Sequence, residues 1–285
     1  MKVLFAAVFT SESTNTSQAD GLERNGCQVI RFPYRDLARK IGNHNMDIAL
    51  VELCKHEKPD VVIFSKCFEI GSWAVEECNK YSKTVLWYMD PIDNNYNSVL
   101  EEKIQLCDLV FCALTEPYEK AKRLGGDKVH FLQEGYDHLC NYPMDVPKKY
   151  NYSFIGNLKG ERKDYYDSFP FTVIQDAYAE KHSEVVSQTK INLNFTIGGT
   201  SDRTYKILAS RGFLLTQPWP GMEKDFTPGK DLVVFNSLEE LQTLGQYYLE
   251  NKEERTMIAY QGYETNKKFS RVAWAQSMLA HITRL

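Results

Sequence analysis

A glycine-containing loop followed by two closely spaced cations could bind phosphate groups. The glycines permit close backbone approach, and a helix that starts behind them would present free N–H groups to an anion. Arg203 and Lys206 lie three residues apart, so they project from one face of that helix and could neutralise a diphosphate. A solvated helix face is the alternative interpretation of this pair. The residues predicted for the phosphate site are Gly198, Gly199, Ser201, Arg203 and Lys206.

A carboxylate that could act as a general base follows an apolar run in the first half. Asp90 comes just after the predicted strand 84–88, and a base that deprotonates a hydroxyl group is expected at such a strand end. The polar loop behind it contains Asp93 and Tyr96, which we expect to line a substrate pocket. Asp before Pro is also common turn chemistry, which is the alternative interpretation of Asp90.

Other polar residues at predicted strand ends are candidates for ligand contacts. Asn157 follows a strand that opens the second half, and it is expected beside the phosphate site unless it only forms a turn with Gly156. Contacts to a second substrate are expected from Thr10, Ser11, Glu134 and Asp137. The loop at Thr10 lacks the Gly-x-Gly-x-x-Gly pattern, which argues against NAD or FAD.

The sequence predicts no metal site and no redox dithiol. The seven cysteines lie mostly in apolar patterns without a C-x-x-C pair, and the histidines show no ligand spacing. No Asp-x-Asp motif is present either. We therefore expect reduced core cysteines and no bound metal or cofactor.

Composition indicates a globular protein, with 43% hydrophobic and 25% charged residues in a chain of 285. No stretch approaches the roughly 18 apolar residues of a membrane-spanning helix, so we expect no membrane span and a cytoplasmic location. Charge is uneven: residues 1–145 carry 16 Lys and Arg against 22 Asp and Glu, and the remainder carries 18 against 16. The basic excess suits a phosphorylated ligand in the second half, whereas the acidic first half argues against nucleic acid.

Apolar runs alternate with amphipathic segments throughout the chain, which predicts an α/β fold with parallel sheets. The strands expected first are 3–9, 28–32, 61–64, 84–88, 109–113 and 128–132, with helices at 18–25, 47–57, 73–81, 98–107 and 117–124. After a linker at 139–152 the pattern restarts. The strands expected there are 152–155, 171–174, 191–195, 213–216 and 232–235, with helices at 183–189, 202–211, 238–251, 253–268 and 272–283.

The wider sequence resembles the group 1 glycosyltransferases, and more closely a branch related to the spore-maturation protein CgeB and to phage proteins. The order of several motifs between residues 61 and 263 carries this resemblance. They are Trp87-Tyr88-Met89-Asp90-Pro91, Gln133-Glu134-Gly135-Tyr136-Asp137, Ser153-Phe154-Ile155-Gly156-Asn157, Asp202-Arg203-Thr204-Tyr205, Gly212-Phe213-Leu214-Leu215-Thr216, Pro220-Gly221 and Glu239-Glu240-Leu241.

The resemblance implies a GT-B fold, in which two Rossmann-like domains face a cleft and terminal helices cross back. We expect an acceptor domain over residues 1–142, a donor domain over 150–265, and a final segment, 266–285, on the first domain. The implied enzyme is a hexosyltransferase-like transferase that holds a nucleotide-sugar donor, preferably a UDP-sugar, without metal. Basic side chains and a helix dipole would stabilise the leaving diphosphate. Gly221 and Glu239 join the donor contacts through this resemblance.

The sequence also departs from the group 1 pattern. Retaining members have two glutamates eight positions apart, and the aligned positions here are Gly198 and Lys206. This difference favours Lys206 as a phosphate contact and leaves stereochemistry and ribose binding open. The acceptor could be a saccharide, a protein, a small molecule or a modified DNA base, and the oligomeric state is not encoded in any motif. A sugar-nucleotide epimerase or hydrolase is an alternative on this architecture, and a non-catalytic sugar-nucleotide-binding protein is a third.

Overall fold

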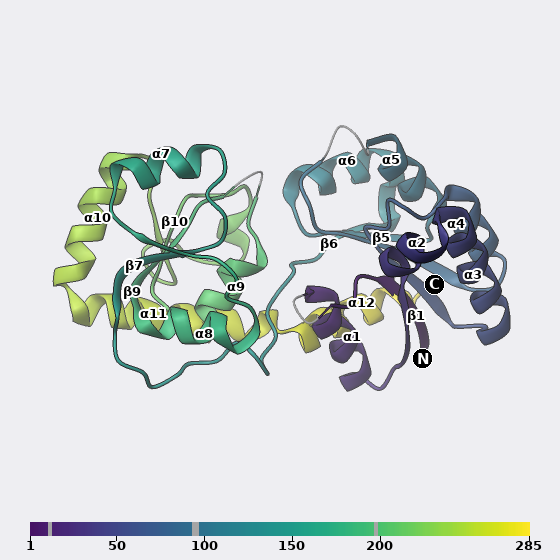
Figure 1. The fold of residues 1–285 in the computed structure, drawn as a ribbon, viewed down its shortest axis with the longest axis horizontal. Helices are drawn as coiled ribbons and strands as arrows, with labels where there is room; N and C mark the ends of the chain where they lie inside the picture. Colours follow the sequence, from purple (N-terminus) through teal and green to yellow (C-terminus); the bar gives the residue numbers. More distant parts are fainter. Residues whose placement is uncertain (11–12, 93–96, 197–198) are drawn as a thin grey trace. The chain divides into compact units, whose positions relative to one another are not determined.

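The computed structural model describes residues 1–10, 13–92, 97–196 and 199–285, which form two compact units (Figure 1). The first unit contains Met1–Glu134 together with Arg271–Leu285. The second contains Gly135–Ser270. The chain therefore leaves the first unit once and returns to it at its C-terminal end.

The first unit is built on a six-stranded sheet with the order β2-β1-β3-β4-β5-β6, in which all neighbouring strands are parallel. Its strands are β1 (Lys2–Ala7), β2 (Gln28–Pro33), β3 (Val61–Ser65), β4 (Lys83–Tyr88), β5 (Leu109–Cys112) and β6 (Val129–Phe131). Its helices are α1 (Thr14–Arg24), α2 (Tyr34–Ile41), α3 (Asn43–Glu57), α4 (Ser72–Asn79), α5 (Asn97–Leu106), α6 (Thr115–Gly125), the short η2 (Gly126–Lys128) and α12 (Arg271–Ile282).

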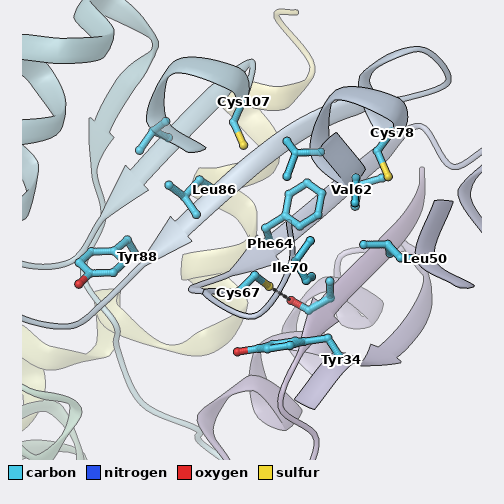
Figure 2. Close-up of a cluster of buried hydrophobic side chains, with 14 of the residues drawn as sticks. Tyr34, Leu50, Val62, Phe64, Cys67, Ile70, Cys78, Leu86, Tyr88 and Cys107 are labelled. Carbon is cyan, nitrogen blue, oxygen red and sulfur yellow. Dashed lines mark hydrogen bonds between the residues drawn. The ribbon is translucent and has the colours of Figure 1, made fainter. Parts of the chain in front are cut away.

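Helices cover both faces of this sheet, so its strands are apolar on both sides. One face packs Val62, Phe64 and Leu86 against side chains of the helices, among them Leu50 and Cys78 (Figure 2). In the same cluster the Cys67 thiol donates a hydrogen bond of 3.1 Å to the carbonyl oxygen of Ala6, which joins the ends of β3 and β1. The six cysteines of this unit are buried and reduced.

Helix α12 covers the other face of the first sheet. Trp274, Ala275 and Met278 belong to the same buried cluster as Val3 and Trp87, and the two tryptophan rings meet edge to face at 5.5 Å. Helix α12 is thus part of the core of the first unit.

Helices α1 and α12 approach each other backbone to backbone at Gly21. A Cβ atom at this position would lie 2.5 Å from the carbonyl oxygen of Arg271, closer than real contacts allow. Only a residue without a side chain permits this approach.

The substitution Gly21→Ala should therefore destabilise the first unit by about 1–3 kcal/mol, because the added methyl group forces the two helices apart. Chemical denaturation measures the change. Arg24→Ala, at an exposed position of the same helix, is the matched control and should change stability by less than about 0.5 kcal/mol. Equal effects of the two substitutions would contradict the close approach.

The second unit is built on a five-stranded parallel sheet with the order β11-β10-β9-β7-β8. Its strands are β7 (Tyr150–Ile155), β8 (Thr172–Ile174), β9 (Thr189–Asn194), β10 (Leu214–Thr216) and β11 (Val233–Val234). Its helices are α7 (Glu161–Ser168), α8 (Ala179–Gln188), α9 (Asp202–Ala209), η3 (Met222–Lys224), α10 (Leu238–Glu250), α11 (Lys252–Asn266) and η4 (Lys267–Phe269).

The strand order of the second unit reverses at β7. The chain goes from β7 to β8 on one side and then crosses to β9 on the other. Helices α8 and α9 pack on one face of this sheet, and α7 and α10 pack on the opposite face (Figure 1). A crevice at the carboxyl ends of the strands is expected at such a reversal point.

The predicted α/β fold with two parallel sheets is confirmed, and every predicted strand is present. The sequence prediction missed two helices, α2 and α7. Helix α7 has no buried residue, so it lacks the apolar periodicity from which helices are predicted. It is nevertheless the helix that brings Arg162 to the site described next.

Candidate phosphate-binding site

A pocket of about 390 Å³ opens in the second unit at the carboxyl ends of β7 and β8, beside the start of α9. Three segments supply most of its wall: the loop after β7, the loop between β8 and α8, and the first turns of α9. The residues that line it are Ile155, Gly156, Asn157, Lys159, Arg162, Gln175, Asp176, Ala177, Tyr178, His182, Asp202, Arg203 and Lys206. We call it the phosphate pocket because four of these side chains are cations.

Arg203 is fixed by the two central strands. Its Nε donates a hydrogen bond of 2.6 Å to the carbonyl oxygen of Ile155, and Nη1 donates one of 2.9 Å to Oδ1 of Asn194. Its guanidinium carbon lies 4.7 Å from the centre of the Phe154 ring. Burial lowers the pKa of Arg203 to about 10, and the nearby Arg162 contributes to this shift. The side chain therefore stays charged at neutral pH, but its charge has lost much of its hydration.

Gly156 makes room for this arginine. The residue follows β7 with a φ of 145°, and a Cβ atom there would lie 2.8 Å from Nη2 of Arg203. A side chain at this position would meet the guanidinium and would also strain the backbone. The Ile155-Gly156-Asn157 step is thus shaped around Arg203.

Arg162 from α7 is the second guanidinium at this strand end. It donates hydrogen bonds to the carbonyl oxygens of Asn157 at 3.3 Å and Phe195 at 3.0 Å, which ties the loops after β7 and β9 together. Its guanidinium carbon lies 5.3 Å from the centre of the same Phe154 ring. The buried Nε has no hydrogen-bond partner among the described residues, and burial lowers the pKa of Arg162.

Two arginines thus share one aromatic ring, and neither forms a salt bridge with any described carboxylate. Like charges at this distance repel, and both have lost hydration. Lys206, by contrast, pairs with Asp202 at 2.6 Å. The charged lining consists of four cations and two carboxylates, a net charge of +2: Lys159, Arg162, Arg203 and Lys206 against Asp176 and Asp202. The arrangement favours an anion with about two negative charges.

His182 is the buried titratable group in the wall of the pocket. It lies on α8 with 4% of its surface exposed, and its Nδ1 has no hydrogen-bond partner in the described part of the chain. Burial, followed by the positive charge of Lys206, lowers the pKa of His182 to about 3. The imidazole is therefore neutral at pH 7.

Because the folded protein does not protonate His182 above pH 3, its stability should fall as the pH drops below 6.5, where the unfolded chain takes up this proton. The loss due to this residue should reach about 2 kcal/mol at pH 5. Chemical denaturation at pH 7.5 and pH 5 gives the free energy of unfolding of the natural protein and of His182→Gln. The decrease in this free energy between the two pH values should be larger in the natural protein. His56→Gln, which replaces an exposed histidine, should keep the natural pH dependence, and the same decrease in all three proteins would contradict the assignment.

A second pocket, of about 370 Å³, shares Lys159 and Arg162 with the first. It lies over the ends of β7, β9 and β10 and is lined by Lys159, Gly160, Glu161, Arg162, Tyr165, Phe195, Thr196 and Gln217. Arg162 thus stands between two hollows, one strongly cationic and one more aromatic.

The structure brings three of the predicted donor-site residues into the phosphate pocket: Asn157, Arg203 and Lys206. Four others do not line it. Gly199 has a φ of 149°, Ser201 precedes α9 without a side-chain capping bond, Gly221 precedes η3, and Glu239 is exposed in α10. Gly198 lies outside the described residues.

The predicted base Asp90 lies in the first unit after β4 and forms an ion pair of 2.5 Å with Lys66. Lys66 and its neighbour Cys67 have φ angles of 60° and 54°. Consecutive non-glycine residues in the left-handed region are uncommon and concentrate at functional sites. The Asp90 carboxylate is 44% exposed, so it remains reachable from solvent.

The other predicted substrate contacts are spread over both units. Thr10 is exposed and its carbonyl oxygen accepts a hydrogen bond from the backbone N–H of Ser13. Glu134 is the last residue before the second unit, and Asp137 accepts a hydrogen bond from the N–H of Leu139 in a turn. Ser11, Asp93 and Tyr96 lie outside the described residues.

Within the described ranges, no three His, Cys, Asp or Glu side chains come together in a way that could hold a metal ion. A search of the same residues found no helix with the length and apolar character needed to cross a membrane.

Sequence reasoning did not predict Tyr178, His182, Lys159 and Arg162 as pocket residues. A signal existed for the last two, because they follow Gly156-Asn157 at the start of the second Rossmann-like pattern. No signal existed for His182. Its position depends on α8 beginning at Ala179, four residues before the predicted start.

Comparisons with known proteins bear on the family and on the fold. Residues 142–280 match the family model described as "Glycosyl transferase-like". The fold is similar to that of HepE from Anabaena, solved in complex with UDP-glucose, with a TM-score of 0.77 at 10% identity over 100% of both chains. No curated protein sequence matches the chain.

Two further solved structures share the fold. A glycosyltransferase from Rickettsia africae has a TM-score of 0.69 at 11% identity and covers 99% of this chain and 98% of its own. Sucrose-phosphate synthase from Thermosynechococcus elongatus has a TM-score of 0.71 at 11% identity, with the same coverage. The chain therefore has the GT-B fold, and its residues 142–280 match a glycosyl transferase-like family; together these findings support a glycosyltransferase.

Proposed function

We propose that the enzyme transfers a sugar from a UDP-sugar to an acceptor hydroxyl group without a metal ion, and that the donor diphosphate binds in the phosphate pocket. The observation that carries this proposal is the pair Arg162 and Arg203, two desolvated guanidiniums on one Phe154 ring without a carboxylate partner among the described residues. Desolvated arginines that lack an internal partner are stabilised when an anionic ligand binds.

The charge of the pocket matches the diphosphate of a nucleotide sugar. The lining carries +2, and a diphosphate esterified at both ends carries about two negative charges at neutral pH. When the bond to the sugar breaks, a further negative charge develops on the diphosphate. Arg203, held in place by Ile155 and Asn194, can stabilise that charge without rearranging. In a metal-dependent enzyme a divalent cation would supply this stabilisation.

The nucleoside is assigned to the loop between β8 and α8. Gln175, Ala177 and Tyr178 line this end of the pocket and carry no charge. The Tyr178 side chain is 48% exposed, so its ring is available for stacking against a base. Uridine is our choice because HepE, with the same fold, was solved with UDP-glucose and with UDP.

Acceptor activation is assigned to Asp90, with Lys66 as the residue that orients it. The ion pair of 2.5 Å fixes the carboxylate beside Lys66, and a carboxylate held at a strand end can accept a proton from a hydroxyl group. Because the first unit carries Asp90 and the second carries the phosphate pocket, we assign the acceptor to the first unit and the donor to the second.

The same order of motifs supports a finer classification. We propose that the chain lies in the branch related to CgeB, on the basis of the Trp87–Pro91, Ser153–Asn157 and Asp202–Tyr205 segments. The structure gives two of these segments a physical reason, since Phe154, Gly156 and Arg203 make one packing unit.

Arg203→Gln and Arg162→Gln should each abolish nucleotide binding, because they remove a guanidinium that faces the diphosphate. The test is thermal unfolding of chelator-treated protein with UDP, GDP, ADP and their sugar conjugates. The natural protein should be stabilised by about 2.7 kcal/mol at a ligand concentration 100 times the dissociation constant. Both variants should show no shift.

Lys163→Ala is the matched control, because Lys163 adjoins Arg162 on α7 but is 71% exposed and lies outside the pocket. It should keep the full nucleotide shift. If no nucleotide stabilises the natural protein in the presence of chelator, the proposed donor site is wrong. If a shift appears only when Mg²⁺ or Mn²⁺ is added, metal independence is wrong.

Asp90→Asn should lower the rate of sugar transfer at least about 100-fold, because the amide cannot accept the proton of the acceptor hydroxyl. UDP release from the UDP-sugar, with an acceptor that supports turnover, measures the rate. The shift caused by UDP should be unchanged, since Asp90 lies in the other unit. Asp36→Asn controls for loss of a carboxylate, because Asp36 on α2 is likewise 44% exposed and paired with a cation. A fully active Asp90→Asn would refute the assigned base.

A further inference from the structure

His182 has no role in the function proposed so far, although it lines the same pocket. Its side chain is 96% buried, and Nδ1 has no hydrogen-bond partner within the described ranges. A buried ring nitrogen of this kind is costly unless a ligand supplies the missing partner. The phosphate pocket is the open space that His182 faces.

The charges that act on His182 come from α9 and from the loop that precedes α8. Lys206 and Arg203 disfavour the protonated ring and Asp202 favours it, and Asp176 lines the same pocket. Lys206 is already paired with Asp202. Burial and Lys206 hold the pKa of His182 at about 3, so the ring is neutral while the pocket contains no anion.

Donor binding and then cleavage of the donor change the electrostatic environment of His182 in favour of its protonated form. The donor, with about two negative charges, offsets the +2 of the lining. In the transfer step the bond between the sugar carbon and the diphosphate oxygen breaks, and that oxygen keeps the electron pair. The sugar carbon bonds to the acceptor oxygen, whose proton passes through the base to solvent. The nucleoside diphosphate now carries a third negative charge, which the lining does not offset.

We propose, on the basis of the function assigned above, that His182 senses the leaving group: it takes up one proton from solvent when the free nucleoside diphosphate forms, and then donates a charge-assisted hydrogen bond to a phosphate oxygen. The proton uptake offsets the proton that the acceptor loses, so the enzyme–product complex stays near neutral. His182 is thereby a phosphate-binding residue that favours the leaving group over the intact donor.

The test follows the imidazole signals of the natural protein by NMR between pH 8 and pH 5, with UDP-glucose or UDP as the probe. His182→Gln identifies the signal of His182. In the free protein and with UDP-glucose this signal should stay in the neutral form. With saturating UDP it should titrate, with a midpoint at least about 3.5 pH units above that of the free protein, because only such a rise protonates most of the ring near pH 6.

Affinity gives a second readout. The terminal phosphate of UDP itself binds a proton near pH 6 and so makes the affinity depend on pH. We therefore compare a ratio, the dissociation constant of His182→Gln divided by that of the natural protein. The titration of UDP affects both constants equally and cancels in this ratio. The ratio for UDP should rise at least about threefold from pH 8 to pH 6. The ratio for UDP-glucose should stay constant. His56→Gln, at an exposed position of the first unit, should give a ratio of one throughout.

The outcomes separate the two proposals. If UDP binds the natural protein but the His182 signal stays neutral and the ratio does not change with pH, the role of His182 is refuted and the donor site stands. A His182 signal that titrates equally with UDP and UDP-glucose refutes the preference for the leaving group. If neither nucleotide binds, the proposed function fails and this inference fails with it.

Discussion

The second unit is organised around one ring. Phe154 is the last residue but one of β7 and lies inside the aromatic core, and the guanidiniums of Arg203 and Arg162 lie against its ring. Each guanidinium is held by oxygen atoms of the protein backbone or of an amide, not by a carboxylate among the described residues. Their positions are therefore set by the register of β7 and β9, whereas their charges are left for a ligand. The two positive charges are thus held in place before a ligand binds, which is electrostatic preorganisation.

Much of the fold could be predicted from the sequence, because the strands are buried on both faces and read as continuous apolar runs. Strand ends were misjudged by up to two residues, as in β7, which begins at Tyr150 and pairs this residue with Thr189 of β9. Helices were found where one face is apolar. Helix α7, with the sequence Glu161–Ser168 and no buried residue, gave no such signal.

The site was predictable only where it follows a strand directly. Asn157 and Arg203 come next to β7 and in the first turn after β9, so counting along the chain was enough to place them in the pocket. Arg162 and His182 come from the first turns of helices that the sequence did not place: α7 was not predicted, and the predicted start of α8 at residue 183 leaves His182 outside the helix. Lys206 shows the same limit of sequence reasoning. Its spacing from Arg203 predicted a phosphate contact, but Asp202, four residues earlier on the same helix, forms an ion pair with it.

Helix α12 has a consequence for how the protein is made. The sheet face that carries Val3 and Phe5 is covered by Trp274, Ala275 and Met278. During synthesis the part of that apolar face under α12 is exposed until the ribosome has added the whole of the second unit and about a dozen further residues. The second unit can fold as soon as it emerges, whereas the first must wait for a contact more than 250 residues away in sequence. The unit translated first is thus the last to be completed, and it is the one that needs protection from aggregation by chaperones.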